Sequence, residues 1–151
     1  MERKKLFKKI DSFSDELINI RRHIHSHPEL SGLENQTAIL IGGFLKNLDW
    51  RVTESVGRTG VVADFGPKDK EFIGLRVDMD ALPIQENTGL SFSSKRDGVM
   101  HACGHDLHIC IGLGVAKIIT DLKLNFGTRI IFQPAEAVSY THLTLPTSTH
   151  G

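Results

Sequence analysis

The most chemically suggestive part of the sequence is the run 100–108, which reads Met-His-Ala-Cys-Gly-His-Asp-Leu-His. It holds three histidines, a thiol and a carboxylate, and thiolate and neutral imidazole are ordinary ligands of zinc-like metals. Cys103 and His105 flank Gly104, which leaves room for the chain to curl around an ion. The pattern predicts that Cys103 and His105 bind metal. The alternative is a histidine-rich turn before a helix, because two ligands do not complete a structural zinc site.

Two neighbours of these ligands are candidates for supporting roles. Asp106 is suited to accept a hydrogen bond from an imidazole and so to orient it, and its residue type also fits a helix N-cap. His108 is a candidate for the surroundings of the metal or of a substrate.

Acidic residues follow two runs that look like strands. Asp78 and Asp80 follow the run 72–77, and Glu136 follows the run 128–132. In open α/β sheets, sites lie at the carboxyl ends of strands. An acid there can steer a histidine or a water, and Glu136 can act as the base that takes a proton from water. Each acid alone also fits a solvated turn after a strand.

A second histidine cluster consists of His23, His25 and His27. Positions two apart on a helix lie on different faces, so these rings do not form one metal-binding surface. We expect them to have a structural role at the end of the first helix.

Three helices are expected to position these residues. Apolar residues recur at spacings of three and four over 4–25, and Pro28 follows as a stop. Ser31 is the expected cap of a second helix that reaches about residue 48, and the glycine pair 42–43 weakens its centre. Asp106 is the expected cap of a third helix, which ends at about residue 122.

Strands complete the expected architecture. Strand-like composition occurs in four runs, with a turn at 66–69; the runs are 51–56, 60–65, 72–77 and 128–132. Helices that alternate with such strands predict a layered α/β domain.

Composition restricts the class of protein. The 151 residues allow one modest domain, and 18 basic against 18 acidic side chains give no general attraction to nucleic acid or to an acidic membrane. No run approaches the roughly 18 apolar residues of a membrane helix, and no signal peptide is evident. The two cysteines, Cys103 and Cys110, fit free or metal-bound thiols better than a disulfide. We therefore expect a cytoplasmic protein.

Taken in order, four segments resemble the amidohydrolase branch of the co-catalytic metallopeptidase family. That branch includes hippurate hydrolase, the indoleacetyl-amino acid hydrolases and N-acetyldiaminopimelate deacetylase. The segments are Arg-Arg-x-x-His-x-x-Pro-Glu-Leu at 21–30, Arg-x-Asp-Met-Asp-Ala-Leu-Pro at 76–83, His-Ala-Cys-Gly-His-Asp-x-His at 101–108 and Phe-Gln-Pro-Ala-Glu at 132–136. The resemblance runs from about Leu17 to Glu136, and four ordered matches are far more specific than any one of them.

The resemblance implies a fold and an activity. The fold is a zinc-peptidase-like, three-layer α/β catalytic domain, of which residues 1–137 would be a truncated N-terminal part. The activity is metal-dependent hydrolysis of the amide bond of small N-acyl amino acids, with no nucleic-acid or membrane partner. The full-length enzyme is expected to be a homo-oligomer.

The resemblance also implies roles for individual residues. Cys103 and His105 would bind two divalent metal ions per full-length subunit, with zinc or manganese expected first and cobalt or nickel also suitable. Asp78 would be the catalytic acid that supports the metal site, and Glu136 would be the general base. Asp80, together with Asp106 and His108, would lie around the metals or the substrate.

The end of the chain departs from the family pattern. The family continues Pro-Ala-Glu-Glu, with the second Glu as a metal ligand, whereas Ala137 stands at that position here. Residues 138–151 read like a translated sequencing adapter, so we expect a non-native tail and a native Glu hidden at position 137; the alternative is a divergent native tail. The chain as given is then expected to bind metal weakly, to lack turnover and to aggregate.

Two other functions stay open on the sequence alone. One is a non-catalytic metal-binding module built on the same half-domain. The other is a dipeptidase or exopeptidase of the same superfamily. Cys103 favours the amidohydrolase branch, because the peptidase branches resemble one another in carboxylate-rich ligand sets.

Overall fold

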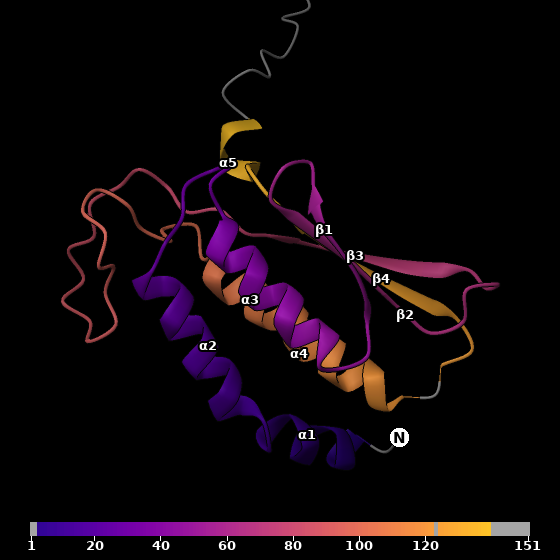
Figure 1. Ribbon diagram of the computed structural model, residues 1–151. Helices are drawn as coiled ribbons and strands as arrows, with labels where there is room; N and C mark the ends of the chain where they lie inside the picture. Colours follow the sequence, from indigo (N-terminus) through magenta and orange to yellow (C-terminus); the bar gives the residue numbers. More distant parts are fainter. Residues whose placement is uncertain (1–2, 123, 140–151) are drawn as a thin grey trace, which may run out of the picture.

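A four-stranded mixed sheet lies at the centre of the computed structural model, which describes residues 3–122 and 124–139 (Figure 1). The strand order is β1-β2-β4-β3, where the strands are β1 (Arg51–Val56), β2 (Gly60–Phe65), β3 (Phe72–Asp78) and β4 (Gly127–Gln133). The expected strands are confirmed to within one residue at each end.

The pairing of the strands brings two predicted site segments to one edge. Strands β1, β2 and β4 pair antiparallel in that order, whereas β3 and β4 pair parallel, with Asp78 opposite Gln133. The segments that follow β3 and β4 therefore leave the sheet side by side. This is the edge at which an open α/β sheet places its site.

Helices cover one face of the sheet. Val61, Ile130 and Phe132 are fully buried on that face, whereas Phe72, which points to the other face, is 36% exposed. A side chain on Gly112 would meet the Val77 methyl at 2.8 Å, so glycine allows the helix that carries it to pack directly on the strands. The described residues thus form the sheet and one helical face of the expected three-layer domain.

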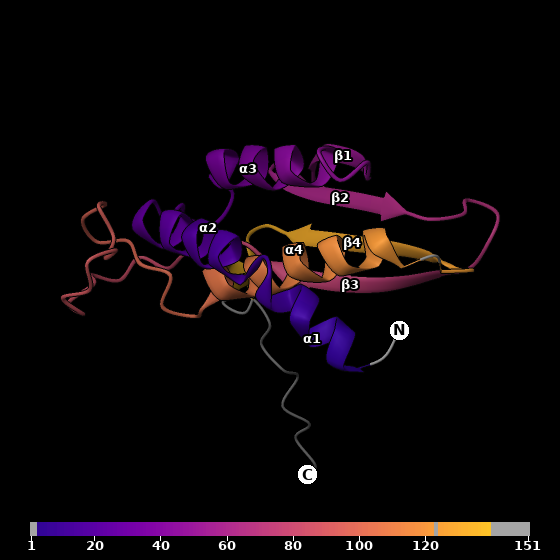
Figure 2. The same cartoon turned by 90° about the horizontal axis from the view of Figure 1, so that it is seen from below.

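Two helices pack directly on the sheet, and a third packs on one of them. Helices α3 (Asn35–Lys46) and α4 (His105–Asp121) lie against the strands, and α2 (Ser14–Ser26) packs on α4 (Figures 1 and 2). The first helix, α1 (Arg3–Asp11), and the one-turn α5 (Glu136–Ser139) complete the set.

The prediction of one continuous helix over 4–25 is wrong, because the helix breaks at Ser12 and Phe13. The Ser12 hydroxyl donates to the Lys9 carbonyl at 2.6 Å, and the Ser14 hydroxyl donates to the Ile10 carbonyl at 2.9 Å. These side chains compete with the backbone for the carbonyls at the end of α1.

Both predicted caps are also wrong. Ser31 lies outside α3 and donates its hydroxyl to Asp80 at 2.6 Å, while the Glu29 carboxylate accepts the first free N–H groups of α3 from Gln36 and Thr37. Helix α4 starts two residues earlier than expected, with Gly104 rather than Asp106 as its N-cap. The φ of Gly104 is +78°, which places it in the left-handed conformation that glycine adopts without strain.

A long connection, the loop 79–104, joins β3 to α4 and stands out at the left of Figure 1. It carries two isolated bridges, Leu30 with Ala81 and Leu82 with Met100. Connections of this length inside a compact domain usually have a functional role. Among the helices described, none is long and apolar enough to span a bilayer.

Candidate metal centre

His105 and Asp80 form the centre of the candidate site. The Nδ1 atom of His105 lies 2.8 Å from the Asp80 carbonyl oxygen and 3.2 Å from its carboxylate. A carbonyl only accepts, so Nδ1 carries a proton and the Nε2 lone pair is left for a metal. The hydrogen bond to Asp80, opposed by burial, raises the pKa of His105.

The Asp80 carboxylate is buried and strongly hydrogen-bonded. Its Oδ2 accepts from the Ser31 hydroxyl at 2.6 Å and from the Ala137 N–H at 2.9 Å. Burial opposes ionisation, but the contact with His105 and these two hydrogen bonds hold the pKa of Asp80 well below its usual range. A fixed negative charge therefore lies behind the imidazole of His105.

Glu136 faces the other side of the same ring. Its Oε2 lies 3.9 Å from Nε2 of His105, which is too long for a direct hydrogen bond. The preceding residue, Ala135, has a positive φ of 53°, and its N–H donates to the buried Glu34 carboxylate at 2.9 Å. The Thr59 hydroxyl donates to the second oxygen of Glu34. Glu34 thus fixes the unusual turn that presents Glu136.

Asp78 and His108 form a neighbouring pair. The Asp78 N–H donates to Nδ1 of His108 at 3.2 Å, and the Asp78 carboxylate lies 3.6 Å from the same nitrogen. Arg76 pairs with that carboxylate at 2.9 Å. The Asp78 charge is one of the causes that raise the pKa of His105, but Asp80 provides the direct contact.

Both cysteines are free thiols, as expected. Cys103 is exposed on the turn that precedes α4, one residue before Gly104. Cys110 is buried on α4, and its Sγ contacts the Leu17 carbonyl at 3.4 Å. Burial, together with the nearby Asp106 charge, raises the pKa of the Cys110 thiol to about 12.

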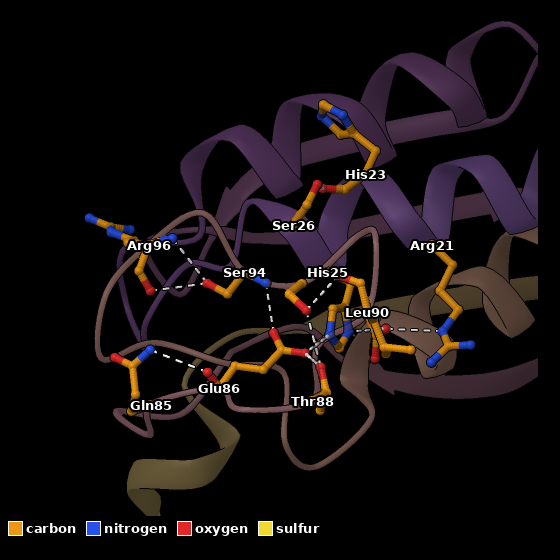
Figure 3. Close-up of polar contacts among 12 residues, drawn as sticks. Arg21, His23, His25, Ser26, Gln85, Glu86, Thr88, Leu90, Ser94 and Arg96 are labelled. Atoms are coloured by element: carbon orange, nitrogen blue, oxygen red, sulfur yellow. Dashed lines mark hydrogen bonds and ion pairs between the residues drawn. The ribbon is translucent and has the colours of Figure 1, made fainter.

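Asp106 orients an imidazole, as the sequence suggested, but the ring belongs to His25. The Oδ2 atom of Asp106 lies 2.9 Å from Nδ1 of His25 and accepts from Nε of Arg21 at 3.0 Å. The other ring nitrogen of His25 lies 3.2 Å from Oε1 of Glu86, and Figure 3 shows this side of the network. The structural role expected for the cluster of His23, His25 and His27 therefore belongs to His25, whose ring is buried.

The donor set fits a divalent metal ion but is incomplete in the described residues. A thiol on Cys103 and a free Nε2 on His105 have the chemistry that zinc-like ions take, and the candidate base Glu136 lies 3.9 Å from that nitrogen. The Oδ1 atom of Asp80 is buried and lies 3.2 Å from Nδ1 of His105, so this carboxylate supports the ring from behind. Within 3–122 and 124–139, no three or more such side chains converge closely enough to hold an ion.

Several residues that build this site are invisible to local sequence patterns. Ser31 and Glu34 support Asp80 and the Glu136 turn, and His25 and Glu86 form the network behind α4. Local sequence gives no signal for Glu34, because its neighbours Leu33, Asn35 and Gln36 are exposed and contacts with distant residues bury its carboxylate.

Comparison with known proteins matches this chain to one family of peptidases. The family model for peptidase family M20/M25/M40 matches residues 74–140. The chain is 46% identical to thermostable carboxypeptidase 1 of Saccharolobus solfataricus, over 87% of this chain and 35% of the relative. It is 45% identical to hippurate hydrolase of Campylobacter jejuni, over 87% of this chain and 34% of the relative. It therefore spans about a third of the length of these curated relatives.

A solved structure gives the same result for the fold. The crystal structure of a dinuclear metal-binding peptidase of the M20 family from Bacillus subtilis superposes with a TM-score of 0.80 at 43% identity. The match covers 85% of this chain and 37% of that one. The mixed α/β arrangement is thus a partial domain of that fold. The chain belongs to peptidase family M20/M25/M40, in its amidohydrolase branch.

Proposed function

We propose that this chain carries part of the active site of a metal-dependent hydrolase that cleaves the amide bond of N-acyl amino acids. The observation that carries the proposal is the ring of His105, held by Asp80 on one side and facing Glu136 on the other. The likeness to hippurate hydrolase supports the substrate class, because hippurate is an acylated glycine.

Cys103 and His105 would hold divalent metal, with zinc or manganese first and two ions in a protein of the relatives' length. The likeness to a dinuclear metal-binding peptidase supports this part of the proposal. When bound, the ions lower the pKa of water and offset the negative charge that develops on the acyl oxygen.

Glu136 would be the catalytic base. It would take a proton from the attacking water and return it to the departing amine. Asp80 would keep Nδ1 of His105 protonated and its ring fixed. The resemblance implied Asp78 as the catalytic acid that supports the metal site. Asp78 would contribute its negative charge from its position beside His108.

The chain as given is proposed to bind metal weakly and to lack turnover. Ala137 places a main-chain N–H beside Asp80 but no ligand side chain. Replacing it, as Ala137→Glu, should raise metal affinity, because carboxylates are metal ligands and the residue adjoins Glu136. A cytoplasmic location and homo-oligomers of the longer protein also belong to this proposal.

A peptidase activity is the second candidate, and the 46% identity to thermostable carboxypeptidase 1 favours it. Both reactions cleave an amide bond next to an amino acid, so the residues above would serve either. Rates with N-benzoylglycine and with a dipeptide that has a free amino group separate the two candidates.

The experiment that tests the proposal uses a version extended to the relatives' length. Glu136→Gln should lower kcat on N-acyl amino acids by about 10²–10⁴-fold while metal content stays the same. The matched control is Glu71→Gln, at an exposed position before β3, which should leave kcat unchanged. Full activity of Glu136→Gln would refute the base, and an inactive wild type with metal bound would favour a non-catalytic metal-binding module.

A further inference from the structure

His25 bridges two buried carboxylates that belong to different elements. The ring is only 4% exposed and sits in the last turn of α2. Its Nδ1 lies 2.9 Å from Asp106, in the first turn of α4, and its Nε2 lies 3.2 Å from Glu86, in the loop 79–104. One imidazole therefore joins three segments, and two of them meet at the turn that carries Cys103.

Glu86 acts only as an acceptor. The Thr88 hydroxyl donates to its Oε1, and the Ser94 N–H donates to its Oε2 at 2.7 Å (Figure 3). Burial would favour the neutral acid, but these donors and His25 lower the pKa of Glu86 to about 2. The Glu86 carboxylate is therefore ionised and has no proton to give to the ring.

The same argument applies to the Asp106 oxygen that faces the ring. Its Oδ2 already accepts from Nε of Arg21 at 3.0 Å, so it also accepts from Nδ1 of His25. A neutral imidazole has one N–H donor, whereas this ring faces an acceptor on each nitrogen. Both contacts are hydrogen bonds only if both ring nitrogens carry protons.

The charges around the ring balance in that state. Arg21 from α2 and a charged His25 offset Asp106 from α4 and Glu86 from the loop. Two further rings lie near the imidazole: the Phe92 ring, whose edge meets it, and the buried ring of His101 at a centroid distance of 6.4 Å. Burial lowers the pKa of His101 to about 4, so that ring adds no charge at neutral pH.

We propose that His25 is a positioning residue for the metal-binding turn, fastening the loop 79–104 to the start of α4 through an imidazole that carries both ring protons. The connection to metal rests on the proposed function, whereas the bridge itself does not. Loss of one ring proton leaves one of the two carboxylates without its donor from His25.

The ring protonation is tested directly by nitrogen NMR of the ¹⁵N-labelled chain at about pH 7.5, where a free histidine is mostly neutral. The signals of His25 are identified by their loss in His25→Gln. The expected result is that both ring nitrogens are protonated. A nitrogen without a proton at that pH would overturn the bridge.

A second arm tests positioning with cobalt(II) as the probe. His25→Gln should weaken cobalt binding by about tenfold, the scale of outer hydrogen-bond partners of metal ligands. His27→Gln is the matched control, because His27 lies in the same tract but is exposed, and within the described residues its ring interacts with Ser26 and His23 rather than with a carboxylate. Equal affinity of His25→Gln and wild type would overturn the positioning role.

A third arm separates positioning from general stability. Glu86→Gln offers Nε2 an amide that can either accept or donate, so a neutral ring is satisfied. Between about pH 6 and 9, the wild type should lose cobalt affinity relative to Glu86→Gln; parallel pH profiles of cobalt affinity would overturn the proposal. If the wild type binds no cobalt, the proposed function fails, and the NMR result still decides the bridge.

Discussion

The Nδ1 atom of His105 lies 2.8 Å from the main-chain carbonyl of Asp80, although 25 residues separate the two in sequence. The contact joins the start of α4 to the end of β3 and fixes which ring nitrogen is left for a metal. Asp80 is also held by Ser31 and by the Ala137 N–H. Three other segments of the chain therefore converge on the Asp80 carboxylate.

The first prediction distinguishes Asp80 from Asp78. Asp80→Asn should weaken cobalt(II) binding by about 10–100-fold, because the fixed charge behind His105 is lost. Asp78→Asn should have a smaller effect, since its carboxylate faces Arg76 and His108. Calorimetric titration of both variants measures this, and a larger loss for Asp78→Asn would restore Asp78 to the role first expected from the sequence.

The two thiols should differ in reactivity without metal. Cys103 is exposed, whereas Cys110 is buried and its thiol pKa is raised to about 12. Because the thiolate is the reactive form, a thiol reagent at neutral pH should modify Cys103 at least about tenfold faster. Mass spectrometry of the labelled peptides gives both rates in one sample. Similar rates would contradict the burial of Cys110.

Acid should destabilise the fold through Glu86. Its pKa is lowered from 4.5 to about 2, so its contribution is fully present above about pH 4.5 and is lost as the pH falls through 2. Glu86→Gln should lower the free energy of unfolding at neutral pH by about 1–3 kcal/mol and flatten its fall between these values.

The control for this prediction is Glu71→Gln, whose side chain is exposed. It should leave the acid dependence unchanged. Chemical denaturation at a series of pH values measures both variants, and a Glu86→Gln curve parallel to that of the wild type would rule out this source of acid sensitivity.

Two glycine-to-alanine substitutions, one on α4 and one on α3, test how closely α4 packs on the sheet. Gly112→Ala places a methyl 2.8 Å from the Val77 side chain and should cost about 1–3 kcal/mol. Gly43→Ala, with nothing within 4 Å, should stabilise α3 by about 0.5–1 kcal/mol. Thermal unfolding of the two variants should shift in opposite directions. A stabilising Gly112→Ala would mean that α4 does not lie this close to β3.

Sequence patterns predicted the strands and the main helices because those depend on local periodicity. The four strands agree to within a residue, since apolar runs such as the one that contains the buried Ile130 and Phe132 are evident from local composition. Helix boundaries were less predictable. Ser31, which looked like a cap, instead donates to Asp80, a contact that depends on how distant segments fold together.

The candidate site likewise contains residues that a local motif identifies and residues that only the folded chain brings together. The motif identified Cys103, His105 and Glu136, and the structure brings His105 and Glu136 to one edge of the sheet. The motif could not show that Asp106 forms a hydrogen bond with His25, 81 residues away, rather than with a histidine of the motif itself. Such buried polar pairs follow from tertiary packing and leave no periodic signal.

The most direct test of the metal site is the absorption spectrum of the cobalt(II)-loaded chain. A thiolate-to-cobalt band should appear in the wild type and in Cys110→Ala, and it should be absent in Cys103→Ser. His105→Gln should weaken cobalt binding as well. A band that survives in Cys103→Ser, or a wild type that takes up no cobalt, would contradict Cys103 and His105 as the metal ligands.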